Sequence, residues 1–328
     1  MSRETVVNLV LLGSLLIVPV YARAVDDPFL ITLSTRVAIF ALAGVGLNLA
    51  LGLGGLVSLG HAAFFGIGGY TAGILASHAL NYAPLIDGII VINGSRSMPV
   101  IWVTTLIVSA CLALLIGALS VRTTGVYFIM ITLAFGQMMY YFSISWPAYG
   151  GEDGLPIAIR NEFPGLNSLD PFQFFLIAYA VLCVTIFLIS RLQDSAFGLA
   201  LNAVRQSARR VEMVGIATFR LRLTAFVLSG MITGLAGALF ADLNRFVSPS
   251  MFSWQTSGEI MIFVILGGTA RLCGPVAGAG MFIILEHLLG GISDYWLIFL
   301  GLLLLVVVLF AQGGLVSWLA GERVRRHG

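Results

Sequence analysis

The chain has 328 residues, of which 59% are hydrophobic and only 10% are charged, and its mean hydropathy is +1.01. A water-soluble domain of this length needs more polar residues to cover its surface, so most of this protein is in contact with lipid. All 17 basic residues are arginine. Without lysine the chain cannot form a GxxxxGK[ST] phosphate-binding loop, a Schiff base or the lysine-dependent core of a kinase. An ATP-driven process would therefore need a nucleotide site on another polypeptide.

Apolar runs long enough to cross a membrane follow one another along the whole chain. A crossing takes about 20 mostly apolar residues, with a range of roughly 17 to 25. The sequence therefore predicts an all-α polytopic membrane protein with about ten transmembrane helices, some of them short or broken, in a single domain covering residues 1–328. The spans are expected near residues 5–22, 29–53, 61–80, 99–120, 125–146, 171–190, 222–242, 256–271, 275–290 and 294–312. The first is interpreted as an uncleaved helix rather than a secretory signal.

The distribution of arginine predicts the orientation, because short loops rich in basic residues stay in the cytoplasm. With a cytoplasmic N-terminus, 12 arginines and four acidic residues fall inside, against four arginines and eight acidic residues outside. The inside arginines are Arg3, Arg122, Arg191, Arg205, Arg209, Arg210, Arg220, Arg222, Arg271, Arg323, Arg325 and Arg326. The outside arginines are Arg23, Arg96, Arg160 and Arg245. Both termini are predicted to be cytoplasmic.

Two connecting segments are long enough to do more than join helices. The exterior loop, residues 147–171, contains prolines, several glycines and an acidic excess, which is typical of an ordered surface. The second is cytoplasmic and contains the segment 195–216, called the cytoplasmic segment below. Its apolar residues recur at steps of four, three, four and three, which predicts one amphipathic helix that begins after Asp194 or Ser195 and ends at Gly215. These apolar residues are Phe197, Leu201, Val204, Ala208 and Val211.

Periodicity alone leaves two interpretations of this amphipathic helix. It either lies flat on the inner leaflet with its apolar face in the acyl boundary, or it docks into a groove of a cytoplasmic partner. The three cysteines, Cys111, Cys183 and Cys273, are far apart in apolar surroundings and are interpreted as packing residues rather than disulfides or zinc ligands. We expect no metal, no cofactor and no catalytic residue.

Several motifs in collinear order carry a family resemblance. They are ALNAVRQSARRVEMVGI at 200–216, LTAFVLSGMITGLAGAL at 223–239, GLNL at 46–49, SLGHAAFFGIGGYTA at 58–72, GVYFIMITLAFGQ at 125–137, GGEDGL at 150–155, Glu259, LGG at 266–268 and GPVAGA at 274–279. Together they resemble the permeases of branched-chain amino acid ABC importers, and specifically the M-type subunit, over nearly the whole chain. The sequence departs from the family pattern at 267–271, where the family usually reads GGxG[ST], and at Tyr149, where a threonine is common. Members of the family also carry urea, short amides and organic acids.

The resemblance implies a transport subunit without its own ATP site. It implies as partners two cytoplasmic ABC ATPases, a second homologous permease and a periplasmic or extracellular solute-binding protein, in the inner membrane's lipid bilayer and with no nucleic acid. The cytoplasmic segment would then be the coupling helix that contacts an ATPase. The residues implied in this coupling are Ala200, Arg205, Arg209, Arg210, Glu212 and Gly215.

Polar groups inside the predicted spans are candidates for a solute pathway. The glycine run at 52–60 should break the second span from the third, and broken helices present free backbone groups that suit a polar solute. The candidates are Ser58, His61, Tyr70, Tyr127, Thr132, Gln137 and Glu259. Each of them is also explained by close helix packing and hydrogen bonds between helices. Arg36, Glu286 and Asp242 are further charged residues in or near spans, where a charge usually faces a cavity or a partner.

Two other classes of function remain as alternatives. A passive channel or an ion-gradient-driven carrier would also be polytopic and free of an ATP site, although the acidic residues of these spans lie near the span ends rather than at mid-membrane, where proton-coupled carriers commonly place them. An intramembrane hydrolase would need a nucleophile and a base on facing helices. Ser229 and His61 are its only visible pair, and no GxSG or paired-aspartate motif accompanies them.

Overall fold

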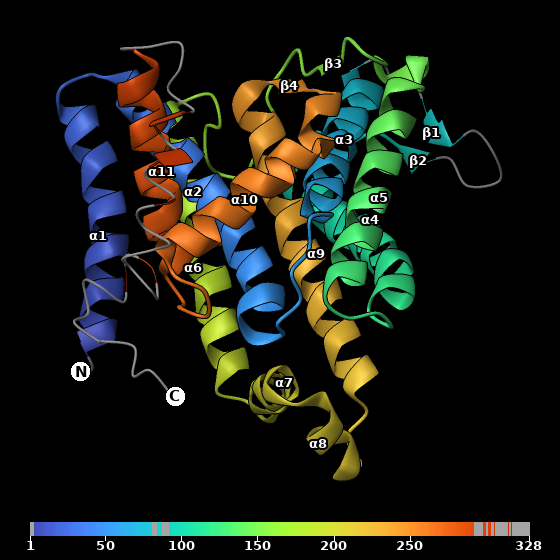
Figure 1. Ribbon diagram of the computed structural model, residues 1–328. Coiled ribbons are helices and arrows are strands. Elements are labelled where there is room, and N and C mark those ends of the chain that lie inside the picture. The colour runs from blue at the N-terminus through green and yellow to red at the C-terminus, as the bar shows by residue number, and fades with distance from the viewer. Residues whose placement is uncertain are drawn as a thin grey trace.

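The computed structural model describes residues 3–80, 84–86 and 92–291, together with residues 298, 299, 301, 302, 305, 314 and 316. Within these residues the chain is a bundle of α-helices (Figure 1). The helices are α1 (Arg3–Ala24), α2 (Pro28–Asn48), α3 (His61–Leu80), α4 (Met98–Ser120), α5 (Val126–Ile144), α6 (Pro171–Gln193), α7 (Ala196–Gln206), α8 (Ala208–Met213), α9 (Thr218–Asn244), α10 (Trp254–Gly267) and α11 (Gly274–Gly290). The all-α prediction is confirmed. The tenth predicted span, 294–312, and the C-terminal arginines lie outside the described residues.

The helix lengths divide the spans into two groups. Among the described residues, seven helices are long and apolar enough to cross a membrane: α1, α2 with its extension to Leu53, α3, α4, α5, α6 and α9. At 1.5 Å per residue, the 14 residues of α10 extend about 21 Å, less than the hydrocarbon core of about 30 Å. The expectation of some short spans is therefore confirmed at α10 and α11, the pair joined by the turn around Leu272.

The break between the second and third spans lies in the predicted glycine run. After α2 the chain widens into a π-helical turn, η1 (Leu49–Leu53), and then runs without helix until His61. Gly55 has φ +67, a left-handed conformation that glycine adopts without a steric cost. π-Helical turns are rare and frequently mark functional sites. This turn lies close to the cytoplasmic segment, since its Leu49 and Leu53 pack with Leu201 of that segment.

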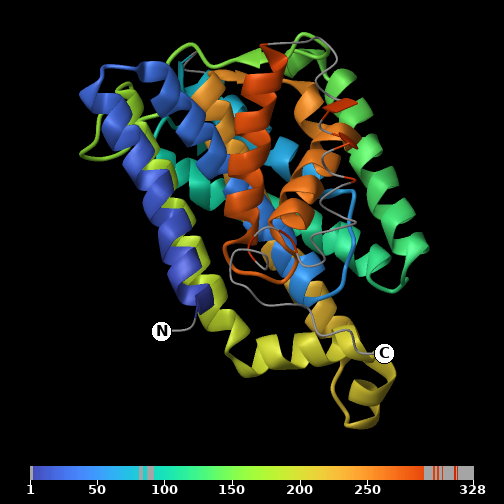
Figure 2. The ribbon, with the colours of Figure 1, turned by 60° about the vertical axis from the view of Figure 1, so that its left-hand side comes forward.

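The long helix α9 is the centre of the bundle, and α2, α3 and α4 pack around it. Close approach of α3 and α9 depends on small residues, since a Cβ on Gly68 would overlap the backbone of Gly234. Small residues at such crossings let membrane helices pack tightly. Figure 2 shows α1 and α6 at the edge of the bundle, with α7 running crosswise beneath it.

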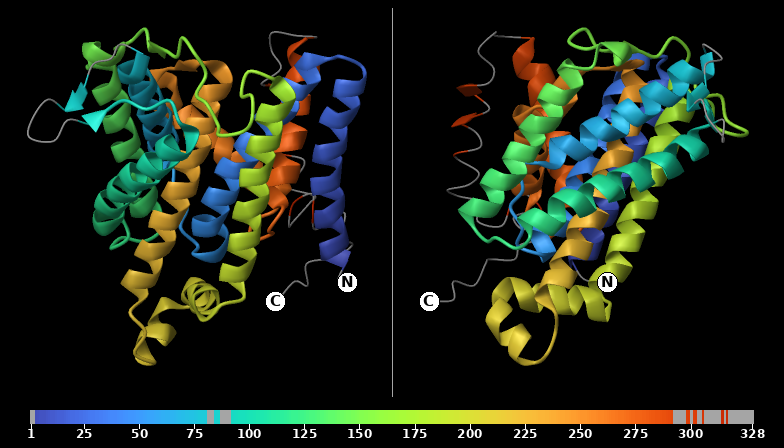
Figure 3. Two further views of the ribbon diagram at one scale, coloured as in Figure 1. Left: turned by 180° about the vertical axis from the view of Figure 1, so that it is seen from behind. Right: turned by 90° about the vertical axis from the view of Figure 1, so that its right-hand side faces the viewer.

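The two ends of the bundle carry different structures. The start of α1 and the helices α7 and α8 lie at one end, whereas the exterior loop lies at the other (Figure 3). The exterior end contains the described short strands β3 (Leu155–Pro156) and β4 (Phe246–Val247), which pair antiparallel, and the 3-10 turns η2 (Pro147–Tyr149) and η3 (Pro249–Phe252). Strands β1 (Pro84–Ile86) and β2 (Ile92–Asn93) form a second small antiparallel pair. Within the described residues, the start of α1 and the cytoplasmic segment, both predicted to lie inside, are therefore at the opposite end of the bundle from the loop predicted to lie outside.

Candidate functional site

The cytoplasmic segment is two helices rather than the single helix that periodicity predicted. Ser195 caps α7, accepting a hydrogen bond on Oγ from the Gly198 nitrogen at 3.4 Å. Ser207 is extended, with φ −162 and ψ 100, so the chain changes direction there before α8 begins. Gly215 has φ +86 and follows α8, as predicted for the end of the segment. The apolar stripe cannot reveal this break, because Leu201 and Val204 of α7 and Val211 of α8 are buried on the same side of the segment.

The apolar face of the segment is covered by the protein itself. Leu201 and Val204 of α7 are 0% and 1% exposed, and Val211 of α8 is nearly buried. Leu201 belongs to an apolar cluster with Leu49 and Leu53 of the π-helical turn η1. The contact places α7 directly on the end of α2.

The opposite face of the segment is open. Met213 and Val214, after α8, are 81% and 78% exposed, and Leu199 of α7 is 65% exposed. Among the implied coupling residues, Arg209, Arg210, Glu212 and Gly215 are also exposed, and Ala200 is half-buried. Glu212 accepts a hydrogen bond on Oε1 from Thr218 Oγ1 at 2.6 Å, which ties α8 to the start of α9. The tip of α8 is the part of the ribbon farthest from the exterior loop (Figure 1).

Arg205 differs from the other arginines of the segment because it reaches inward. Its Nη1 donates a hydrogen bond to the carbonyl oxygen of Gly52 in the π-helical turn η1. Its aliphatic stem lies over Gly55, where a Cβ would be 3.1 Å from the Arg205 Cγ. This arginine therefore contacts the transmembrane helices of its own chain.

His61 belongs to a fully buried hydrogen-bonded group at the start of α3. Its Nε2 lies 2.7 Å from Ser229 Oγ, and Ser229 Oγ donates to the carbonyl oxygen of Gly46 at 2.7 Å. A hydroxyl has one proton, so His61 Nε2 is the donor in this arrangement. His61 and Ser229 are both 0% exposed. The group ties α3, α9 and α2 together.

The same geometry bears on the hydrolase alternative. The structure brings Ser229 and His61 together, as that alternative requires. However, a nucleophilic serine must give its proton to the histidine, and here the hydroxyl proton is directed to the Gly46 carbonyl. Neither side chain is accessible to a substrate. This arrangement is that of an interhelical tie and not of a nucleophile with its base.

The remaining pathway candidates fall into a buried and an accessible set. Ser58 and Thr132 are 0% exposed, and Tyr70 is 4% exposed and packs against the Phe252 ring at 5.3 Å between centroids. Tyr127 is 73% exposed on α5 and is not brought together with the buried set. Gln137 and Glu259 are half-buried. The role of all these candidates in a solute pathway stays a prediction.

An ion pair joins two predicted spans, α2 and α11, toward the end of the bundle that carries the exterior loop. Arg36 Nη2 of α2 is 3.1 Å from Glu286 Oε1 of α11, and the two side chains are 39% and 26% exposed. Charged groups within spans rarely face lipid. This face of α2 and α11 therefore borders either water or another protein.

Sequence reasoning missed how Arg160, Asn161 and Asp242 hold the exterior end together. Arg160, 8% exposed, donates to the carbonyl oxygens of Asp242, Ser168 and Leu243 at 3.0, 2.8 and 3.1 Å. Burial and the nearby Arg245 lower the pKa of Arg160, although a guanidinium remains charged. Asn161 Nδ2 donates to Asp242 Oδ1 at 2.6 Å. A lone arginine in a loop carries no pattern that distinguishes this buried role from a solvated one.

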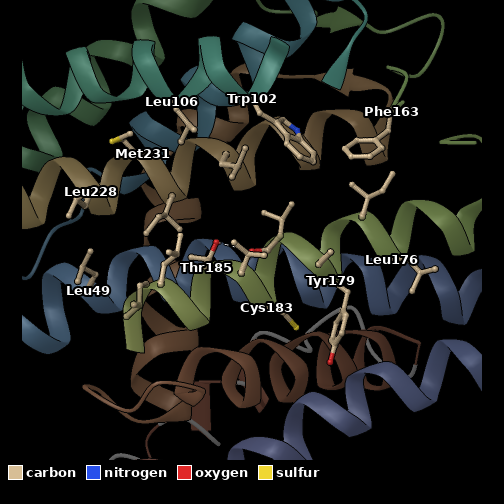
Figure 4. Close-up of a pocket in the computed structure, with 18 of the residues that line it drawn as sticks. Leu49, Trp102, Leu106, Phe163, Leu176, Tyr179, Cys183, Thr185, Leu228 and Met231 are labelled. Carbon is tan, nitrogen blue, oxygen red and sulfur yellow. Dashed lines mark hydrogen bonds between the residues drawn. The ribbon is translucent and has the colours of Figure 1, made fainter. Parts of the chain in front are cut away.

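A cavity of about 1120 Å³ opens between α4, α6 and α9 (Figure 4). Its walls are hydrocarbon side chains such as Leu106, Leu176 and Met231, with Trp102 and Phe163 near one end and Thr185 as one of its few polar groups. None of the predicted pathway residues lines it. Such walls cannot replace the hydration of a charged solute, so this cavity is not a candidate solute site.

Comparison with known proteins gives one matching family. The profile of the branched-chain amino acid transport system permease component matches residues 29–308. The chain is 26% identical to the high-affinity branched-chain amino acid transport system permease protein LivM of Salmonella typhimurium over 323 residues, covering 89% of this chain and 72% of that protein. LivM of Escherichia coli K12 is 26% identical over 332 residues, with coverages of 92% and 74%.

A second group of relatives matches a smaller part of the chain. The autoinducer 2 import system permease protein LsrC of Escherichia coli O9:H4 is 28% identical over 229 residues, covering 67% of this chain and 65% of that protein. No solved protein structure matches the chain. The relatives named here are transport permeases, and their named solutes differ.

Proposed function

This chain belongs to the branched-chain amino acid transport system permease family, and we propose that it is the transmembrane subunit of an ABC importer for branched-chain amino acids or a related small polar solute. It is a multi-pass protein of the bacterial cytoplasmic membrane. In the proposed assembly it pairs with a second, homologous permease, two cytoplasmic ATPases and a solute-binding protein. The ATPases hydrolyse ATP, and the permease carries no chemistry of its own.

The observation that carries this proposal is the exposed tip of the cytoplasmic segment. Met213 and Val214 are about four-fifths exposed beyond the bundle, next to Arg209 and Arg210. Methionine with neighbouring arginine is a combination enriched in protein interfaces. A cytoplasmic ATPase with an apolar groove and an acidic rim fits this tip, and ATP-driven closure of the ATPases would move it.

The burial of the inward face argues against a segment that lies on the membrane surface. A surface helix immerses its apolar face in the acyl boundary. In this chain that face, represented by Leu201 and Val204, is already buried against the protein. The residues left for another partner are Leu199, Met213 and Val214, together with the arginines. A projecting, mixed surface of this kind is suited to a protein partner.

Two other surfaces of the chain are suited to the remaining proposed partners. The partly exposed pair Arg36 and Glu286 lies at membrane depth, where a second permease or a water-filled path between two permeases would cover it. The exterior loop is held rigidly by Arg160, with Glu152 and Asp153 exposed on it. This gives a solute-binding protein a fixed docking surface.

Alternating access follows from a lever at one end of the bundle. The segment joins α6 to α9, and α9 packs against α2, α3 and α4. A displacement of α7 and α8 would therefore shift the central helix relative to its neighbours and open the path to one side at a time. The pathway candidates Gln137 and Glu259 are half-buried polar groups past which a solute would move.

The test is ATP-dependent uptake by the complete transporter in proteoliposomes. Co-expression of the permease with its partners should give a complex that takes up leucine, or the solute bound by its binding protein, only with ATP inside. Uptake by the permease alone, driven by a proton or sodium gradient, would overturn the proposal in favour of a secondary carrier. Uptake by the permease alone that runs down the solute gradient without either source would indicate a channel. Binding measurements on the solute-binding protein identify the solute.

A further inference from the structure

A chain of hydrogen bonds begins at Arg205 and leaves the cytoplasmic segment. The guanidinium donates to the carbonyl oxygen of Gly52 in the π-helical turn η1. This turn follows directly from Asn48, the last residue of α2. The link joins a side chain outside the membrane to the backbone of a membrane-spanning helix.

Asn48 continues the chain of contacts to a third element. Its Nδ2 donates to the carbonyl oxygen of Arg271 at 2.8 Å, and its Oδ1 accepts from the nitrogen of Ala270 at 3.0 Å. Both partners belong to the turn between α10 and α11. The asparagine is 5% exposed, so this pair of bonds is shielded from water. One amide side chain therefore holds the α10–α11 turn by both a carbonyl and an N–H group.

The contact between the two turns is tight enough to transmit a displacement. A Cβ on Gly52 would lie 2.7 Å from the Ala270 nitrogen and 2.9 Å from its Cα, closer than atoms can approach. Ala270 itself has φ +65, a conformation that a non-glycine residue adopts only when its surroundings hold it. Packed elements of this kind move together rather than deform. The turn between α10 and α11 is thus fixed to the end of α2.

The hairpin of α10 and α11 carries two of the carboxylates that lie within the predicted spans. Glu259 lies on α10, and Glu286, on α11, pairs with Arg36 of α2. A shift of the turn at Ala270 would change the position of these two helices as a unit. No direct hydrogen bond links Arg205 to α10 or α11 among the described residues, so Asn48 is the polar connection.

We propose that Arg205, the π-helical turn at Gly52 and Asn48 form a coupling relay that moves the α10–α11 hairpin together with the cytoplasmic segment. The relay rests on the proposed function, because it needs an ATPase to displace the segment. It assigns Arg205 to the permease side of the coupling and leaves Arg209, Arg210 and Met213 for the ATPase. Asn48 acts in it as a positioning residue, since it touches neither solute nor ATPase.

The experiment measures solute taken up per ATP hydrolysed by the complete transporter in proteoliposomes. Asn48→Ala should lower this ratio about 30-fold, the factor that corresponds to two ordinary hydrogen bonds lost together, while the ATPases still copurify and still hydrolyse ATP. Arg205→Met keeps the stem over Gly55 and removes the donor. Arg205 is at the surface, so folding is retained, and we expect a similar fall in the ratio. Asn244→Ala is the same change as Asn48→Ala at the exposed outer end of α9 and should leave the ratio at the wild-type value.

The double variant distinguishes a relay from two separate effects. Two residues that act in series share one loss of coupling. The ratio of the double variant, Arg205→Met with Asn48→Ala, should therefore be within about twofold of the ratio of the worse single variant. Arg209→Ala acts at the ATPase surface and outside the relay. The variant that combines Arg209→Ala with Asn48→Ala should therefore lower the ratio by the product of the two single-variant factors. The relay is wrong if Asn48→Ala lowers uptake and ATP hydrolysis in the same proportion, or if Arg205→Met releases the ATPases. A wild-type complex without ATP-dependent uptake would overturn the proposed function itself, and the relay with it.

Discussion

The exterior loop and the cytoplasmic segment are of similar length, yet they are attached to the bundle in different ways. The exterior loop is fixed by a buried arginine, Arg160, whose three hydrogen bonds go to backbone carbonyls, and by the paired strands β3 and β4. The cytoplasmic segment is attached by a small apolar face and by the inward hydrogen bond of Arg205, and it leaves apolar side chains such as Met213 exposed. The first region is held by buried polar contacts, whereas the second leaves an exposed surface that, in the proposed function, binds an ATPase and moves with it.

The difference has a physical basis in the number of buried contacts. Segments with few buried apolar contacts and an exposed backbone open at low free-energy cost, and moving elements are drawn from them. In the proposed mechanism the exterior end would keep its position while the cytoplasmic segment is displaced. Each prediction below perturbs one end and uses the other as its comparison.

The largest effect is expected at the exterior end. Arg160→Ala would leave three carbonyl oxygens without their donor in a buried site, which costs about 3–5 kcal/mol. The melting temperature of the detergent-solubilised subunit should fall by several degrees. Arg96→Ala is the matched control, because its exposed ion pair with Glu162, at 2.8 Å, is worth about 0–1 kcal/mol. An equal fall in melting temperature in the two variants would contradict the buried role of Arg160.

The next effect is expected at the tip of the cytoplasmic segment. Met213→Asp places a charge in the proposed ATPase groove and should weaken ATPase binding by about 2 kcal/mol, or roughly 30-fold. The stability of the permease should not change, because Met213 makes little contact within its own chain. Met213→Leu should retain binding. Copurification of the ATPases with each variant measures the effect, and undiminished copurification of Met213→Asp would exclude the tip as a docking site.

The next effect, a matched one, is expected at two glycines with similar positive φ at opposite ends of the bundle. Gly215 has φ +86 and Gly165 has φ +82, and a Cβ on either would meet nothing within 4 Å. Replacing either by valine should therefore cost about 1–3 kcal/mol of backbone strain without a clash. Only Gly215→Val should impair ATP-coupled uptake, since Gly165 lies in the exterior loop. Gly215→Asn should restore function, because asparagine tolerates the left-handed region. Impaired coupling in both valine variants would show that the two ends are not distinct.

Much of the fold could be predicted from sequence because its signals are local. Span length, the glycine break before His61, the cap at Ser195 and the helix end at Gly215 each depend on a few neighbouring residues, and the structure has all of them. The family resemblance, carried by motifs in collinear order, is confirmed by the matching profile.

What could not be predicted depends on contacts between distant residues. Arg160 in a loop and Asn48 at a helix end have ordinary sequence surroundings, and only the packed structure places their donors against Asp242 and Arg271. The sequence makes His61 a pathway candidate because it follows the glycine run at 52–60, whereas the structure surrounds it with Phe64, Phe226 and Ser229. The inward turn of Arg205 is equally invisible in an amphipathic pattern that puts all arginines on the polar face.

The smallest effect is expected at Ser207, where the predicted single helix is broken. The Ser207 side chain makes no capping hydrogen bond to α8, so the break is imposed by the burial of Val204 before it and Val211 after it. Ser207→Ala should therefore keep the break and change stability by at most about 0.5 kcal/mol, the difference in helix propensity. Ser207→Pro should be worse, because the Ser207 nitrogen donates to the Ala203 carbonyl at 3.0 Å and φ is −162, far from the value that proline requires. Spin labels on either side of residue 207 measure whether the two helices keep their relative direction. A single straight helix in Ser207→Ala would mean that the serine, and not packing, sets the break.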